Sequence, residues 1–132
     1  MSLRIYTDGG SLNNPGPAAY AFAVYRDNEL IYSEGKAIGV ATNNVAEYTG
    51  LIKMLEWLKS HSQNDAVVVF SDSQLMVNQV NGLFKVKNAA IREFILKIRG
   101  LEQEIGLTIV YKHIPREKNS FTDSLVKKAL GR

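Results

Sequence analysis

The stretch YTDGGSLNNPGPAAYAFAVY, residues 6–25, decides the fold of this protein. Residues 3–8 alternate like a β-strand and end on an aspartate, Asp8. A turn rich in Gly, Asn and Pro then leads into a second alternating segment. Because a carboxylate at the end of a buried strand is costly unless it is paired, Asp8 raises the question of which other charged groups reach the same place.

The composition indicates one ordinary globular domain. The chain has 132 residues, of which 45% are apolar and 22% charged, so we expect a single domain over residues 1–132 with one hydrophobic core. There is no cysteine, which excludes disulfides and thiolate metal sites. No apolar run reaches the ~20 residues of a membrane span, and no leader precedes Leu3. The expectation is a cytoplasmic protein without a membrane segment; the net charge of +3 by itself says little.

Periodicity predicts an α/β fold. Three alternating segments, 3–8, 18–25 and 30–38, predict strands in an antiparallel meander. Further elements are predicted in this order: a helix at 45–58, a strand at 66–70, a helix at 74–80, a long helix after Asn88, a strand at 107–112 and a helix from Ser120. The order βββαβααβα favours a central five-stranded mixed sheet, three antiparallel strands followed by two parallel ones, flanked by helices. Gly50 inside the first helix costs ~1 kcal/mol relative to Ala, which predicts close packing there.

Four acids are placed to converge at one edge of this sheet. Asp8 ends the first strand and Asp72 follows the fourth, so parallel neighbours would bring both to the carboxyl edge. Glu47 and Asp123 lie in the first turns of two helices and could face the same crevice. Carboxylates that close repel one another, and a divalent cation removes the repulsion. Oxygen ligands without thiols or an imidazole cluster favour Mg²⁺ or Mn²⁺.

Each acid also has a purely structural interpretation. Asn44 to Glu47 fits a capping box, and Ser120 to Asp123 resembles a second one. Asp72 could begin a helix, and Asp8 could anchor a turn. Four caps around one sheet edge nevertheless explain the pattern less well than one metal site does.

Four motifs in order resemble those of type 1 ribonuclease H over nearly the whole chain. They are Thr7-Asp8-Gly9-Gly10 with Asn14-Pro15-Gly16, then Thr42-Asn43-Asn44 with Glu47, then Asp72-Ser73-Gln74, and finally His113 with Asn119 and Asp123. Any one of them is weak, and the ordered set is very specific. The chain is similar to the short form of the family, which lacks a basic protrusion.

The resemblance implies an endoribonuclease. It would hydrolyse the RNA strand of RNA–DNA hybrids with little sequence specificity, leaving 5′-phosphate and 3′-hydroxyl ends. Two Mg²⁺ ions, or Mn²⁺ as a substitute, would be held by Asp8, Glu47, Asp72 and Asp123. One ion would activate the attacking water, and the other would stabilise the leaving 3′ oxygen. His113 would act as a proton shuttle or help products leave.

The resemblance also implies the residues that contact the substrate. The expected substrate-binding residues are Gly9, Gly10, Asn14, Thr42, Asn43, Asn44, Gln74 and Asn119. The amide side chains of Asn14, Asn43, Asn44 and Gln74 would contact the minor groove of the hybrid, where 2′-hydroxyls are displayed. Thr42 would contact a phosphate of the DNA strand. These residues also suit turns and caps, and both roles can coexist. A monomer without an obligate protein partner is expected.

Two departures from the family pattern bear on binding. Longer relatives carry a basic helix and loop after the Asp72 helix, whereas here residues 81–88 lead directly to the next helix. Lys85 and Lys87 could serve in part, and weaker or more salt-sensitive binding is expected. Thr122 and Val126 stand where the family usually has small residues.

Three other functions stay open at this point. The chain could be a related nuclease that acts on double-stranded RNA or junctions, although those lack the Asn-Asn and Asp-Ser-Gln set. It could be a module that binds hybrids without cutting them, but four acids facing a phosphate backbone repel it unless metal is bound. An actin-like phosphotransferase needs two such domains, and this chain supplies one.

Overall fold

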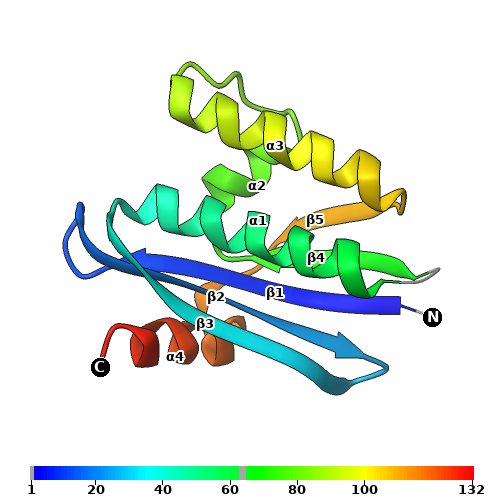
Figure 1. The fold of residues 1–132 in the computed structure, drawn as a ribbon, viewed down its shortest axis with the longest axis horizontal. Coiled ribbons are helices and arrows are strands. Elements are labelled where there is room, and N and C mark those ends of the chain that lie inside the picture. Colours follow the sequence, from blue (N-terminus) through cyan, green and yellow to red (C-terminus); the bar gives the residue numbers. More distant parts are fainter. Residues whose placement is uncertain (1, 63–64) are drawn as a thin grey trace.

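The computed structural model describes residues 2–62 and 65–132, which form one central sheet flanked by helices (Figure 1). The strands are β1 (Ser2–Ser11), β2 (Gly16–Arg26), β3 (Glu29–Ala41), β4 (Ala66–Ser71) and β5 (Ile109–His113). The helices are α1 (Asn43–His61), α2 (Gln74–Val80), α3 (Ala89–Ile105) and α4 (Ser120–Ala129), with a short 3-10 turn, η1 (Arg116–Lys118), before α4.

The sheet is mixed, as predicted. Its order is β3-β2-β1-β4-β5, with antiparallel pairing from β1 to β3 and parallel pairing of β4 with both β1 and β5. The first strand is longer than the predicted segment 3–8 because its pairing with β2 continues through Asp8 and Gly9 to Ser11. The two strands that end at the acids, β1 and β4, are parallel neighbours in the middle of the sheet.

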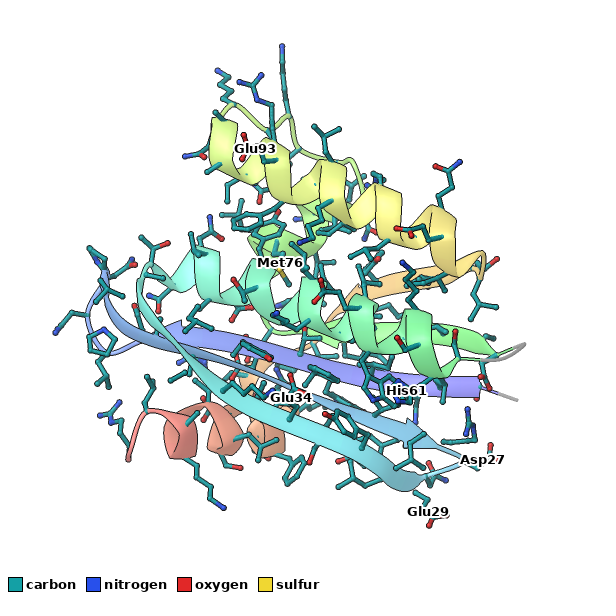
Figure 2. All side chains as sticks on the ribbon, viewed as in Figure 1. Asp27, Glu29, Glu34, His61, Met76 and Glu93 are labelled. Carbon is teal, nitrogen blue, oxygen red and sulfur yellow. The ribbon has the colours of Figure 1, made fainter. Side chains whose placement is uncertain are left out.

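Helices cover the two faces of the sheet unequally. Helices α1, α2 and α3 lie on one side, and α4 lies on the other (Figure 1). The main core joins Leu3 and Ile5 of β1 to Leu51 and Leu55 of α1. Met76 of α2 is also fully buried, between the helices (Figure 2). On the opposite face, Ala19 and Ala21 of β2 contact Val126, so small side chains let α4 lie close to the sheet.

The packing of α1 confirms the close approach predicted at Gly50. A Cβ at Gly50 would lie 2.9 Å from the carbonyl oxygen of Asp8, so the helix approaches β1 as closely as predicted. Trp57 packs half-buried against the core, and its ring stacks on Tyr32 and on His61, the last residue of the helix. In the part of the chain that the structure describes, no helix has the length and apolar character to cross a membrane.

Candidate active site

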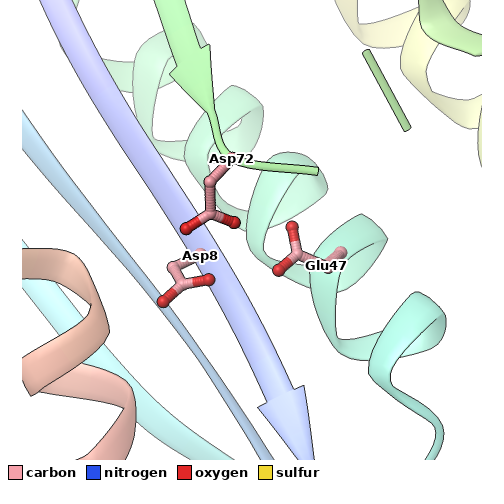
Figure 3. A group of neighbouring side chains, drawn as sticks. All are labelled: Asp8, Glu47 and Asp72. Atoms are coloured by element: carbon pink, nitrogen blue, oxygen red, sulfur yellow. The ribbon is translucent and has the colours of Figure 1, made fainter. Parts of the chain in front are cut away.

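Three carboxylates converge beside the carboxyl ends of β1 and β4. Asp8 lies on β1, Asp72 directly follows β4, and Glu47 reaches them from α1 (Figure 3). One carboxylate oxygen from each lies within 4.8 Å of the others. The cause is the parallel register, which pairs Thr7 with Ser71 and so carries the next residue of each strand to the same edge.

A backbone amide and a missing side chain fix the approach of α1 to β1. The N–H of Gly9 donates to Asp8 Oδ1 at 2.9 Å and to Glu47 Oε1 at 3.0 Å. A Cβ at Gly9 would lie 2.4 Å from the carbonyl carbon of Ala46, closer than any side chain tolerates. Only glycine therefore lets Glu47 reach the sheet edge at this point.

Burial makes this group of acids electrostatically unfavourable on its own. The side chains of Asp8 and Glu47 belong to residues only 6% and 8% exposed. Burial, together with repulsion from Asp72, raises the pKa of Asp8 to about 7. Burial and the neighbouring Asp8 also raise the pKa of Glu47 well above its usual value. A nearby positive charge would favour the ionised forms of both groups.

The donor set fits a hard divalent cation. Among residues 2–62 and 65–132, Glu47 Oε2 is buried and has no hydrogen-bond partner, although the other oxygen of the same carboxylate accepts from the N–H of Gly9. Buried polar atoms nearly always have a hydrogen-bond partner. A buried carboxylate oxygen without one, beside two further carboxylates, therefore indicates a binding site for a cation. Carboxylate oxygens are the ligands preferred by Mg²⁺ and Mn²⁺.

Asp123 lies on the wall of the crevice and outside the group of three. It lines, with Asp8, Glu47 and Asp72, a crevice of about 610 Å³. Asp123 Oδ2 forms an ion pair with Lys127 one turn along α4, at 3.0 Å. The four acids thus face one crevice, and three of them form the tight group.

The capping interpretations of these acids are wrong. The cap of α1 is Thr42, whose hydroxyl accepts from the N–H of Val45 at 3.2 Å, so Asn44 lies inside the helix and Glu47 bonds to Gly9 instead. Helix α4 is preceded by Asn119 at its cap position, not by Ser120. The cap of α2 is Ser73, whose hydroxyl accepts from the N–H of Met76 at 3.3 Å, which leaves Asp72 without a capping role.

Asn119 connects α4 to the acids. Its side chain is buried, and Nδ2 donates to the carbonyl of Thr7 at 2.9 Å and to Asp72 Oδ2 at 3.4 Å. Its Oδ1 accepts from the hydroxyl of Thr122. Thr122 therefore helps to hold the Asn119 amide that contacts Asp72.

The other expected substrate contacts divide into two groups. Gly9, Gly10, Asn14, Asn43 and Asn44 line the crevice. Thr42 and Gln74, at helix N-termini, lie outside its lining. His113, expected as a proton shuttle, also lies outside the lining and is exposed at the end of β5.

Asn43 is hydrogen-bonded to the end of β1 and to the turn between β1 and β2. Its Oδ1 accepts from the N–H of Ser11 at 2.8 Å, and its own N–H donates to Asn14 Oδ1 at 2.9 Å. The start of α1 and the turn that contains Asn14 therefore form one wall of the crevice. Asn43 consequently serves the fold as well as lining the crevice.

Several crevice residues were not predicted from the sequence as site residues. They are Ser11, Ser73, Val126, Leu130 and Arg132. Arg116 and Lys127 also line the crevice, and both belong to a basic cluster that the sequence predicts to contact phosphates. Ser73 directly follows Asp72, so the local sequence carried a signal for it. No pattern in the sequence places Arg132 beside the acids, because only the direction of α4 brings it there.

Comparisons with known proteins agree with this geometry. The family model described as RNase H matches residues 1–131. The bifunctional protein Rv2228c of Mycobacterium tuberculosis is 39% identical over 98% of this chain, which spans only 36% of that relative's length. Ribonuclease HI of Helicobacter pylori is 32% identical, with 96% of this chain and 92% of the relative covered. The crystal structure of LC11-RNase H1 in complex with RNA/DNA hybrid has a TM-score of 0.93 at 38% identity, covering 98% of this chain and 97% of that one.

Proposed function

The chain belongs to the RNase H family, and from that premise we propose that it hydrolyses the RNA strand of RNA–DNA hybrids in the carboxylate crevice. The observation that carries the proposal is the group formed by Asp8, Glu47 and Asp72, with its buried, unpartnered Glu47 oxygen. The hybrid bound to LC11-RNase H1, a protein of nearly the same fold, supports the choice of substrate. Because the chain spans about a third of one relative's length, activities of longer relatives are not carried over.

The metal-binding residues in this proposal are Asp8, Glu47 and Asp72, with Asp123 on the crevice wall. Mg²⁺ is the proposed cation, and Mn²⁺ is a substitute. Bound divalent cations supply Lewis-acid stabilisation for the attacking water and the leaving 3′ oxygen in an in-line displacement.

The chain's own residues position the groups that react. The Gly9 N–H orients two of the carboxylates, and Asn119 orients Asp72 from the other side. Arg116 and Lys127, on the same crevice, offer positive charge to the phosphates of the substrate. A backbone bound there is held by fixed groups, so little reorganisation is needed when the phosphodiester reacts.

Amide side chains are proposed to select the RNA strand. Asn14, Asn43 and Asn44 line the crevice, and an amide both donates to and accepts from a 2′-hydroxyl. Gln74 and Thr42, at the starts of two helices, extend this contact surface in the proposal. Since all base pairs display the 2′-hydroxyl on the RNA strand, cleavage should have little sequence preference.

His113 is proposed to move a proton or to assist product release. It is the last residue of β5 and is paired in register with Ser71, one residue before Asp72. Its exposure leaves the ring free to move toward the crevice edge, as a shuttle requires.

The substrate class is tested with three labelled duplexes of the same sequence: RNA–DNA hybrid, double-stranded RNA and double-stranded DNA. Each is incubated with Mg²⁺, with Mn²⁺ and with chelator. The expected result is metal-dependent cutting within the RNA strand of the hybrid, with 5′-phosphate and 3′-hydroxyl ends. Equal cutting of double-stranded DNA would identify a general nuclease, and binding of the hybrid without cutting would identify a binding module. Either result contradicts the proposal.

A further inference from the structure

The sheet face that carries α4 is only partly covered. Helix α4 packs against β1, β2 and β3, and α1 to α3 lie on the other face (Figure 1). Away from α4, the strand pairings place Tyr6 beside Phe70, and Phe70 beside Lys112, on this same face. None of these three residues is buried. We call this region the open sheet face.

Aromatic rings dominate the open sheet face. The ring of Tyr6 stacks on Phe70 with centroids 5.0 Å apart and meets Tyr25 edge-on at 5.6 Å. Phe121, at the start of α4, is 42% exposed. Tyr6, Tyr25 and Phe121 line a cavity of about 230 Å³ together with Arg4 and Lys118.

The charged side chains that line this cavity, Arg4 and Lys118, are both positive. The guanidinium of Arg4 lies 5.6 Å from the centroid of the Tyr25 ring and donates to the hydroxyl of Tyr6 at 3.2 Å. Lys112 and Lys118 are exposed. Within residues 2–62 and 65–132, no acidic residue lines the cavity, and none of these three cations is in a salt bridge.

We propose that the open sheet face binds single-stranded nucleic acid, with unpaired bases stacked on its rings and phosphates on its cations. The residues of this second site are Arg4, Tyr6, Tyr25, Phe70, Lys112, Lys118 and Phe121. A sheet that displays aromatic rings among cations suits unpaired bases, whose faces are free, whereas a duplex hides the faces of its bases. A basic rim with no acid among the lining residues complements a polyanion.

This site is separate from the carboxylate crevice. The start of α4 lies between them: Phe121 and Thr122 line the open-face cavity, and Asp123 and Val126 line the crevice. Binding at the open sheet face needs no metal and no cleavage, so the inference goes beyond the proposed function. An unpaired strand that adjoins a hybrid could be held there while the duplex part occupies the crevice.

The test uses fluorescence anisotropy with a labelled single-stranded oligothymidylate of about ten nucleotides, within the usual site size. The buffer contains EDTA, which removes the divalent cations that would hold phosphates in the crevice. Two variants remove one feature each: Phe121→Ala removes a ring, and Arg4→Gln removes a charge. Leu96→Ala and Lys97→Gln, at exposed positions on α3, are the matched controls.

Phe121→Ala should weaken binding by about fivefold or more, the loss of one stacked base. Arg4→Gln should reduce the slope of log K against log salt by about 0.7, the loss of one phosphate contact on a single strand. Both control variants should bind like the parent. Parental binding by Phe121→Ala and Arg4→Gln, or equal losses in the controls, would overturn the proposal. So would an equal effect of Phe121→Ala on binding of a duplex of the same length.

A second measurement locates the bound strand without any substitution. Amide chemical shifts in ¹H–¹⁵N spectra of the metal-free protein should change on adding the oligonucleotide at Tyr6, Tyr25 and Phe121. Changes confined to Gly9, Gly10 and Asn43 would place the strand in the crevice and overturn the proposal. This measurement decides the question even if Phe121→Ala does not fold.

Discussion

Asp8 and Glu47 bring carboxyl groups to a buried place where, without a cation, the protonated forms are favoured. The pKa of Asp8 is raised from 3.8 to about 7 in the folded protein, chiefly by burial and then by Asp72. Its contribution to stability is therefore fully present below pH 3.8 and is lost as pH rises through about 7. Each unit by which a pKa differs between the folded and unfolded states changes the free energy of unfolding by about 1.4 kcal/mol.

We expect the metal-free protein to lose stability between about pH 4 and pH 7, and Mg²⁺ to restore it above pH 7. Thermal unfolding in EDTA across this range measures the loss. In Asp8→Asn the dependence on pH should be flatter, because the titrating group is gone. A parental pH profile in this variant would show that Asp8 does not carry the effect.

Gly9 is the residue on which the approach of α1 depends. Gly9→Ala should destabilise the fold by about 1–3 kcal/mol, because its Cβ would lie 2.4 Å from backbone atoms of Ala46. Gly10→Ala is the matched control, since its Cβ would lie 3.8 Å from its nearest neighbour, Asn43 Oδ1. Denaturant unfolding measures both, and equal stability of the two variants would contradict the packing argument.

His113 should act on turnover more than on affinity. We expect His113→Ala to lower kcat by about tenfold or more with little change in KM, because proton transfer is felt in the transition state. His61→Ala, at the end of α1, is the matched control and should behave like the parent. A raised KM with parental kcat in His113→Ala would identify a binding role instead of a shuttle.

At the scale of elements, the buried amide of Asn119 joins the start of α4 to β1, in addition to the apolar packing of α4 on the sheet. Asn119→Ala should cost about 1–3 kcal/mol, since the carbonyl of Thr7 and the hydroxyl of Thr122 lose a buried partner. Cleavage should fall as well, because Asp72 loses its contact with Nδ2. Ser120→Ala, at the exposed next position, is the control for denaturant unfolding and for kcat. If Asn119→Ala were as stable as the parent, Asn119 would not hold the start of α4 against the sheet.

Local patterns predicted the order of strands and helices well, because alternation and helical spacing depend on neighbouring residues. They failed where a distant contact decides. The capping box at Asn44 looked convincing, yet Glu47 bonds to Gly9 across to β1, and Thr42 caps the helix. The extension of β1 to Ser11 likewise depends on its pairing with β2. Neither contact can be predicted from the residues that neighbour it in the sequence.

At the scale of the molecule, the sequence could predict the convergence of Asp8 and Asp72 because strand order and parallel pairing are enough to place them together. Glu47 required the close approach of α1, which Gly50 indicated. The distinct place of Asp123 on the crevice wall could not be predicted, because it depends on how α4 lies against the sheet. The open sheet face could not be predicted from the sequence either, because its residues come from separate strands and from α4.

The most direct test of the whole account is the cleavage of a labelled RNA–DNA hybrid by Asp72→Asn at saturating Mg²⁺. Asp27→Asn, the same substitution in the turn between β2 and β3, is the control. We expect Asp72→Asn to fold, to keep or raise its melting temperature in EDTA through relief of repulsion, and to cut essentially no RNA, while Asp27→Asn cuts at the parental rate. Parental cleavage by a folded Asp72→Asn would contradict the account.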